Sequence, residues 1–275
     1  MTETVSSASI LCMFVTLAIC IGLPVAALIF VRKKLKGDIL PFAIGAGVFF
    51  VFVLILEQLL HLGVNALFGR QLASHVWLYA LYGGLTAGIF EETGRFLAMK
   101  FLMKKRLRKE NALMYGVGHG GAEAILLIGV TYMSNITFSV MINLGLLNMI
   151  PDGFMGGLKE QLIPQLSALW TTRPSAFLLS GMERISAFFL QLCLSYIVYR
   201  AVKDQQILLF IVAVAVHFAA DACIVLVAQS APLWLTEVSL AVSVCILCVF
   251  IFHAYRTERA EEPAADPALD AEGKE

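Results

Sequence analysis

The chain has 275 residues, of which 59% are hydrophobic and only 15% are charged. This composition excludes a soluble domain of that size and predicts an integral membrane protein that crosses the bilayer several times. The formal net charge is zero, and no basic footprint indicates that the chain binds nucleic acid.

Runs of about 20 apolar residues predict transmembrane helices. Seven such runs lie near residues 8–31, 40–60, 76–99, 111–132, 176–200, 206–229 and 233–255. No basic segment precedes the first run, so we expect it to be retained as a helix rather than cleaved as a signal peptide. The predicted fold class is all-α, a polytopic transmembrane helix bundle of seven to eight spans.

An eighth span depends on the run 135–150. With about 16 residues it is short for a full crossing, and an eighth span, a re-entrant segment and an interfacial helix all fit it. The positive-inside rule places the basic loops at 32–36 and 100–109 in the cytoplasm and the N-terminus outside. Seven spans put the basic residues around 200–203 and 256–259 on the cytoplasmic side too, so the charges favour seven.

Two further segments differ in composition from the apolar runs. Residues 151–175 are rich in proline and glycine, which predicts a long irregular connection that serves as a lid or a substrate-entry element. Residues 257–275 are acidic and carry no aromatic side chain, which predicts a disordered tail. The expected organisation is one transmembrane domain over residues 1–256, followed by this tail.

The third apolar run ends in Glu91, Glu92 and Arg95. Charges at bilayer depth are costly, so their presence there is a hypothesis of function. Glu91 and Arg95 are four residues apart and share a helix face, while Glu92 is rotated by about 100°. One carboxylate can thus be held by the guanidinium while the other acts as a general base, although a purely structural ion pair fits the same residues.

His119 and Glu123 share a face of the next helix, among small residues that let neighbouring backbones approach. Glu92 is eight residues before Lys100, or about 12 Å of helix, and His119 is ten residues after Lys109, or about 15 Å. Because the two helices are antiparallel across a short loop, the sequence predicts that these groups lie at similar depth.

His217 and Asp221 repeat the four-residue spacing near the middle of the sixth apolar run. A histidine with a carboxylate one turn away is typical of an oriented base or a metal ligand, although a packing histidine also fits. Glu183 and Arg184 lie seven or eight residues into their helix, where a functional role and simple mutual neutralisation fit equally well.

This set of side chains predicts a catalytic centre of Glu91, Glu92, His119 and His217. Carboxylates and histidines together can activate water and stabilise an oxyanion, which is what hydrolysis of an amide needs. They can equally relay protons, or hold zinc through His119, His217 and Glu92. No HExxH motif, serine nucleophile or phosphate-binding loop is present.

The order Glu91-Glu92-x-x-Arg95, His119-x-x-x-Glu123 and His217-x-x-x-Asp221 resembles the bacterial YhfC family of intramembrane peptidases. That family is similar to the PrsW proteases and, more distantly, to the CAAX-processing and bacteriocin-processing membrane endopeptidases. The resemblance covers residues 8–255 and implies a multi-pass protein of the bacterial plasma membrane.

The resemblance also implies roles for the side chains. Glu91 or Glu92 would be the general base, His119 and His217 would position water or stabilise the oxyanion, and Arg95 and Asp221 would orient a carboxylate and His217. Only two residues separate Glu92 from Arg95, whereas the CAAX-type pattern has three, so prenylated substrates are not expected. The implied substrate is a membrane-embedded or juxtamembrane peptide, with no obligatory cofactor and with zinc as the alternative.

Two other functions use the same residues. A proton-coupled transporter needs buried histidine–carboxylate pairs and a path that alternates between the two sides. A non-catalytic membrane scaffold would saturate these groups with one another. A protease site should instead open to water from one face, which we expect to be the cytoplasmic one, and laterally to a substrate helix. The sequence does not specify the oligomeric state.

Overall fold

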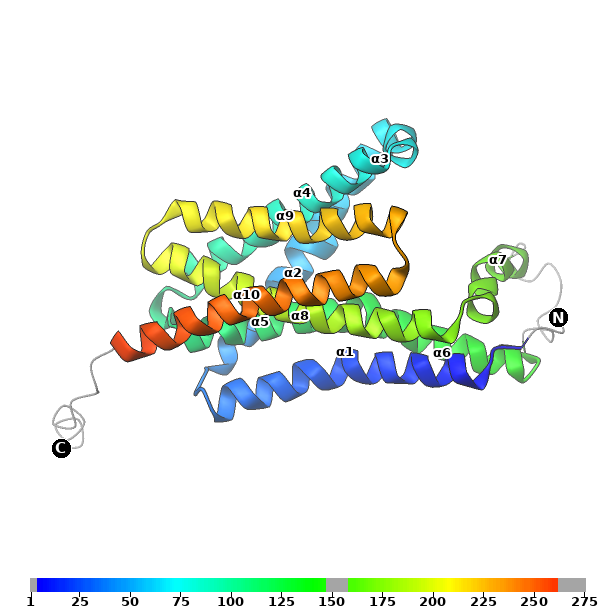
Figure 1. The fold of residues 1–275 in the computed structure, drawn as a ribbon, viewed down its shortest axis with the longest axis horizontal. Helices are drawn as coiled ribbons and strands as arrows, with labels where there is room; N and C mark the ends of the chain where they lie inside the picture. Colours follow the sequence, from blue (N-terminus) through cyan, green and yellow to red (C-terminus); the bar gives the residue numbers. More distant parts are fainter. Residues whose placement is uncertain (1–3, 147–157, 262–275) are drawn as a thin grey trace.

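The computed structural model describes residues 4–146 and 158–261, which form a bundle of long helices (Figure 1). Six of the described helices are long and apolar enough to cross a membrane: Ser7–Lys33, Ile39–Ser74, Lys109–Asn143, Pro174–Lys203, Ile207–Ser230 and Leu233–Glu258. A seventh helix, α4 (Val76–Leu97), has 22 residues, but its two glutamates and its arginine lower its hydropathy. The described helices therefore fit seven spans.

The first long helix is α1 (Ser7–Lys33), and the second runs from α2 (Ile39–Val51) through η1 (Phe52–Glu57) into α3 (Gln58–Ser74). The third is α4, which continues into η2 (Ala98–Leu102). After the short η3 (Lys104–Arg106), the fourth runs from α5 (Lys109–Glu123) through η4 (Ala124–Gly129) into α6 (Val130–Asn143). The remaining elements are α7 (Leu158–Thr171), α8 (Pro174–Lys203), α9 (Ile207–Ser230) and α10 (Leu233–Glu261). The elements η1, η2 and η4 are π-helical, a conformation that often occurs next to functional sites.

Three of the predicted boundaries differ from the structure. The run at 135–150, for which an eighth span was one of three alternatives, begins inside a continuous helix of 35 residues over Lys109–Asn143, and its last four residues lie outside the described residues. The predicted irregular connection at 151–175 contains α7 and the start of α8. Helix α10 continues to Glu261, past the predicted start of the tail, and the rest of the tail lies outside the described residues.

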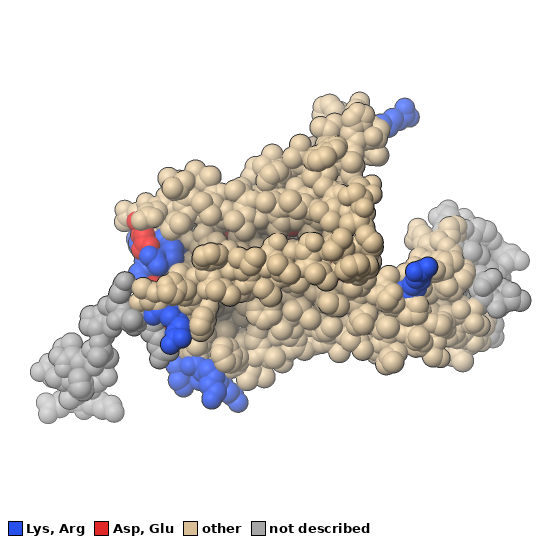
Figure 2. Space-filling view, viewed as in Figure 1, with Lys and Arg blue, Asp and Glu red and all other residues tan. Residues whose placement is uncertain are grey.

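Basic residues gather at one end of the bundle, apart from isolated ones at the other end (Figure 2). There Asp38, between α1 and α2, accepts hydrogen bonds from Arg106 and Arg108 at 3.2 Å and from the Asn111 amide at 3.0 Å. The Asn111 hydrogen bond and then the two guanidinium groups lower the pKa of Asp38. The positive-inside rule assigns this end, hereafter the basic end, to the cytoplasm.

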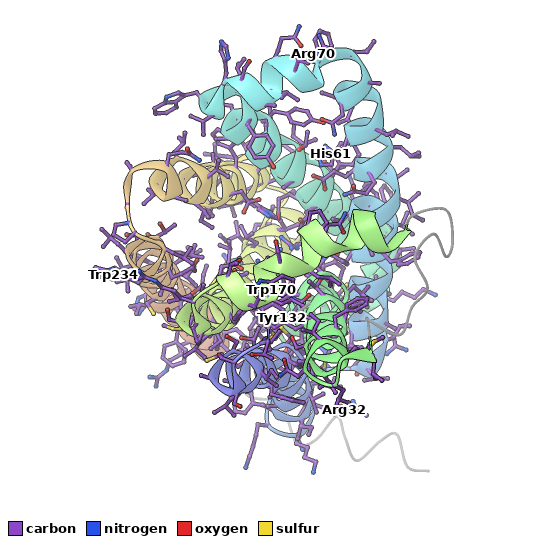
Figure 3. The ribbon with its side chains drawn as sticks, turned by 90° about the vertical axis from the view of Figure 1, so that its right-hand side faces the viewer. Arg32, His61, Arg70, Tyr132, Trp170 and Trp234 are labelled. Atoms are coloured by element: carbon purple, nitrogen blue, oxygen red, sulfur yellow. The ribbon has the colours of Figure 1, made fainter. Side chains whose placement is uncertain are left out.

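The opposite end of the bundle, hereafter the outer end, carries tryptophans that suit a membrane interface. Trp77 and Trp234 are the second residues of α4 and α10, and their side chains are exposed. Trp170 belongs to α7, which lies across this end of the bundle (Figure 3). Tryptophans are enriched at the interface between hydrocarbon and water, so these positions support a bilayer that spans the length of the bundle.

Two close helix contacts bring the predicted site residues together. A Cβ atom on Gly118 of α5 would lie 2.0 Å from the Phe42 carbonyl oxygen of α2, and one on Gly88 of α4 would lie 2.9 Å from the Val214 carbonyl oxygen of α9. Only glycine permits these approaches of backbone to backbone. The first contact packs α5, which carries His119, against α2. The second packs α4, which carries the glutamates, against α9, which carries His217.

Candidate active site

Glu92 is held between Arg95 and His217 inside the bundle. Arg95 donates from Nη1 to the Glu92 carboxylate, and Glu92 Oε1 lies 2.7 Å from His217 Nδ1. Neither the Glu92 nor the Arg95 side chain is exposed. The sequence predicted that Arg95 holds one carboxylate and leaves the other free, but it favoured Glu91. The guanidinium instead holds Glu92, three residues before it, because Glu91 is engaged by another helix.

Glu91 faces the Nε2 atoms of both histidines. Its Oε2 atom lies 2.8 Å from His119 Nε2, and its Oε1 atom lies 3.9 Å from His217 Nε2. Asp221 Oδ2 lies 3.6 Å from the same His217 nitrogen, so the predicted pair of His217 and Asp221 is present. Three helices, α4, α5 and α9, thus contribute to one centre, and the predicted depth match between the glutamates and His119 is confirmed.

The His119 ring is fixed by aromatic neighbours. Tyr115 stacks on it with ring centroids 5.9 Å apart, and Phe49 of α2 meets it edge-on at 5.3 Å. Its Nδ1 atom has no hydrogen-bond partner among the described residues. The expected pairing of His119 with Glu123 does not form among the described residues: His119 Nε2 bonds to Glu91, and Glu123 bonds to Arg184 and Gln191 instead.

Glu123 belongs to a neighbouring ion-pair group on α5 and α8. Arg184 donates from Nη1 to Glu123 Oε1 at 2.8 Å, and from Nε to Glu183 Oε2 at 3.0 Å. This arrangement matches the mutual neutralisation that the sequence left open for Glu183 and Arg184. The group nevertheless contacts the centre through one further residue.

That residue is Gln191 of α8, which the sequence did not predict as part of the site. Its Nε2 atom donates to Glu91 Oε2 and to Glu123 Oε2, both at 2.9 Å, and its Oε1 atom accepts from Arg95 Nη2. The side chain therefore joins the centre to the ion-pair group. A signal was present in the sequence, because Arg184 and Gln191 are seven residues apart and so share one helix face.

The exposure of the site rises toward the outer end. The Glu91 and His217 side chains are 8% and 3% exposed, whereas Asp221, one turn farther from the basic end on α9, is 38% exposed. Glu183 is 21% exposed and also lies farther toward the outer end than Gln191 of its own helix. The described side chains of the site thus become more exposed toward the outer end, and the expected opening to water from the cytoplasmic face stays a prediction.

A second histidine–glutamate pair, with a buried glutamate and a partly exposed histidine, lies in the outer half of the bundle. His61 Nε2 is 3.3 Å from Glu57 Oε1, and His61 Nδ1 is 2.7 Å from the Tyr82 hydroxyl of α4. Glu57 and His61 have the same four-residue spacing as the other pairs, but the sequence did not predict that they meet Tyr82. Figure 3 shows His61 in the view onto the outer end.

Comparison with known proteins shows the family to which the chain belongs. The model of a family described as "YhfC intramembrane metalloprotease" matches residues 19–241. The chain belongs to the YhfC family. It is 37% identical over 203 residues to the "Uncharacterized membrane protein YhfC" of Bacillus subtilis (strain 168), covering 73% of this chain and 78% of that protein. No solved structure matches.

Because the YhfC family is described as a metalloprotease family, the side chains of this site were compared with the ligands of a zinc ion. Ligands at about 2.0 Å from a tetrahedral zinc ion lie about 3.3 Å from one another, and the His119–Glu91 and His217–Glu91 separations of 2.8 and 3.9 Å bracket that value. Glu92, bonded to His217 Nδ1, matches the carboxylate that orients a ligating histidine. The residue types suit zinc, but no three or more His, Cys, Asp or Glu side chains of the described part are arranged to hold an ion as they stand.

Proposed function

We propose that this chain is an intramembrane endopeptidase of the bacterial plasma membrane, which hydrolyses a peptide bond in or near the bilayer. The observation that supports it is the placement of Glu91, whose two oxygens face the Nε2 atoms of His119 and His217. His217 lies ten residues after the start of α9, or about 15 Å from the basic end, and this distance supports a centre deep in the hydrocarbon.

Glu91 is the general base in this proposal. Its Oε2 atom is held by His119 and Gln191, which leaves Oε1 directed at the space beside His217 Nε2. A separation of 3.9 Å suits a water molecule that contacts both atoms from one side. Oε1 takes a proton from that water as its oxygen attacks the carbonyl carbon, and Glu91 returns the proton to the leaving nitrogen when the C–N bond breaks.

His217 is the electrophilic partner in this proposal. Glu92 accepts from its Nδ1 side and is itself fixed by Arg95, so the Nε2 atom keeps its direction toward the reacting carbonyl. A hydrogen bond from Nε2 to the developing oxyanion stabilises the tetrahedral intermediate in a site that excludes water. Glu92 and Arg95 are positioning residues in this scheme.

A metal-dependent form of the same reaction uses the same side chains. A divalent ion would be held by His119, His217 and Glu91. In this ligand set Glu91 takes the place of Glu92, which the sequence suggested, because Glu92 lies on the Nδ1 side of the His217 ring and Glu91 on the Nε2 side. A bound zinc ion would supply Lewis acidity at the carbonyl and a water of lowered pKa.

The test is cleavage of membrane peptides by the purified full chain. A library of single-span peptides in proteoliposomes is followed by mass spectrometry, with and without chelator, for the wild type and for the Glu91→Gln, His119→Ala and His217→Ala variants. Thermal melts establish that all proteins are folded. We expect cleavage by the wild type and a loss of at least about 100-fold in each variant. Loss with chelator and recovery with zinc assign the metal-dependent form.

One result would overturn the proposal. If the folded wild type cleaves no peptide under either metal condition, while proton flux across the same vesicles depends on Glu91 and His217, the chain is a transporter. The flux measurement uses the same proteoliposomes with a pH-sensitive dye inside, so both activities are compared on one preparation.

A further inference from the structure

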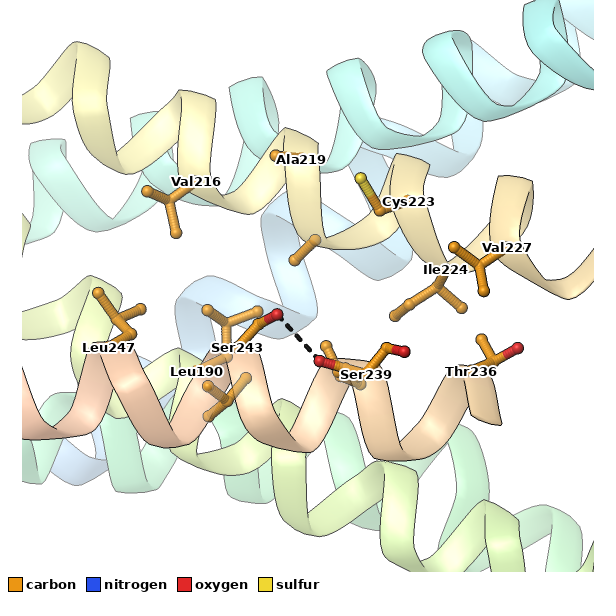
Figure 4. Close-up of a pocket in the computed structure, with 13 residues that line it drawn as sticks. Leu190, Val216, Ala219, Cys223, Ile224, Val227, Thr236, Ser239, Ser243 and Leu247 are labelled. Atoms are coloured by element: carbon orange, nitrogen blue, oxygen red, sulfur yellow. Dashed lines mark hydrogen bonds between the residues drawn. The ribbon is translucent and has the colours of Figure 1, made fainter. Parts of the chain in front are cut away.

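A cavity of about 310 Å³ lies between α9 and α10, with α8 behind it (Figure 4). Small side chains line both sides: Ala219, Ala220 and Cys223 on α9, and Ser239 and Ser243 on α10. Small residues at facing positions normally let two membrane helices pack closely, yet here they border a space. We call this space the α9–α10 groove.

The α9–α10 groove runs beside the candidate active site. Three of its lining residues, Leu190, Val216 and Ala220, immediately precede Gln191, His217 and Asp221 in the sequence. Successive residues of a helix are rotated by about 100°, so the groove and the centre lie on adjoining faces of α8 and α9. Asp221, with 38% of its side chain exposed, is the most accessible of the centre's ionisable groups.

One polar atom in the groove has no partner. Thr236 is 2% exposed, and its hydroxyl makes no hydrogen bond to any described residue. Figure 4 shows its side chain directed from α10 toward the space below α9. The hydroxyls of Ser239 and Ser243 donate to the carbonyl oxygens of Leu235 and Ser239, at 2.8 and 2.9 Å, and each oxygen can still accept a hydrogen bond.

These hydroxyls indicate the chemistry of the occupant. A buried polar group without a partner is unfavourable, so the groove suits a molecule that supplies one. A lipid acyl chain has no such group. An extended peptide has an N–H and a C=O on every residue, and within a bilayer each of these must be satisfied by protein. The row of Thr236, Ser239 and Ser243 along α10 provides partners for them.

We infer that the α9–α10 groove binds an extended segment of the membrane-embedded substrate next to its scissile bond, with Thr236 as a hydrogen-bonding partner of the substrate backbone. This inference rests on the proposed function, because it assigns the place from which a peptide reaches that centre. Entry between α9 and α10 is lateral from the lipid, and the furrow between these helices lies on the face shown in Figure 2.

The first test measures binding without catalysis. Cys223 lines the groove and Cys245 does not, and both are exposed free thiols, which gives a matched pair. Benzophenone-maleimide is attached to the Glu91→Gln protein in proteoliposomes, which also contain a labelled single-span peptide or a lipid with a labelled acyl chain. We expect crosslinking to the peptide that Cys223→Ser abolishes and Cys245→Ser leaves unchanged. Crosslinking at Cys223 to the lipid alone, with no competition by excess peptide, would overturn the inference.

The second test separates this inference from the proposed function. Thr236→Val keeps the shape and removes the hydroxyl, and Thr137→Val does the same at an exposed position where the hydroxyl bonds to its own helix. We expect Thr236→Val to raise KM for a membrane peptide about tenfold with little change in kcat, and Thr137→Val to leave KM unchanged. An unchanged KM with normal cleavage contradicts the groove alone. If no peptide is cleaved, the proposed function fails and the crosslinking result still decides the groove.

Discussion

Helix α9 meets its neighbours in two different ways. Toward α4 the backbones touch, since a Cβ on Gly84 would lie 2.7 Å from the Phe218 carbonyl oxygen. Toward α10 the side chains leave a cavity of about 310 Å³. The close face fixes His217 against Glu92, and the open face borders the groove that we assign to the substrate. One helix thus combines a closely packed side, which carries the proposed catalytic residue His217, with a side that has room for a ligand.

The largest effect is expected on the close face, from removal of the Arg95 charge. Arg95→Met leaves the Glu92 carboxylate without its counter-ion inside the bundle, which is expected to cost about 3–5 kcal/mol of stability. The double variant Glu92→Gln/Arg95→Met removes both charges and should recover much of that loss. Thermal melts of the two variants in detergent measure the difference, and equal destabilisation would show that the ion pair does not anchor this face.

A smaller effect is expected from filling the close contact between α4 and α9. Gly84→Ala places a methyl group against the Phe218 backbone and should destabilise the protein by about 1–3 kcal/mol. Gly83→Ala is the matched control, because a Cβ at Gly83 meets nothing within 4 Å. Denaturation of the two variants is compared with the wild type. Similar stabilities for both would contradict the close packing of this face.

The smallest effect on stability is expected on the open face. Ala219→Leu extends a side chain into the α9–α10 groove, where the space can accept it, so stability should change by less than about 1 kcal/mol. Cleavage of a membrane peptide should nevertheless fall several-fold as the groove fills. A stability loss as large as that of Gly84→Ala would show that the two faces of α9 are packed alike.

Much of this arrangement follows from the sequence. The spans follow from apolar runs, and the meeting of Glu91 with His119 follows from counting helix residues on either side of a short basic loop. The pairing of Arg95 with Glu92 rather than Glu91 was not predictable, because His119 and Gln191 from two other helices engage Glu91. Glu123 likewise bonds to Arg184, which lies 61 residues away.

Other features depend on contacts that leave no local signature. Helix α7 forms within a segment whose prolines and glycines predicted an irregular connection. The α9–α10 groove results from how far apart two apolar helices lie, and their sequences alone would equally suit close packing. Gln191 is uncharged and lies in an apolar run, so only its spacing from Arg184 indicated that it faces the site.

The measurement that tests the central claim most directly compares two glutamates bound by the same amide. Gln191 Nε2 donates to Glu91 and to Glu123 at 2.9 Å, but only Glu91 faces both histidines. Initial rates of peptide cleavage are measured for Glu91→Gln and Glu123→Gln at matched folding. We expect at least about a 100-fold loss for Glu91→Gln and less than about tenfold for Glu123→Gln. Equal losses, or full activity in Glu91→Gln, would contradict the assignment of Glu91 as the base.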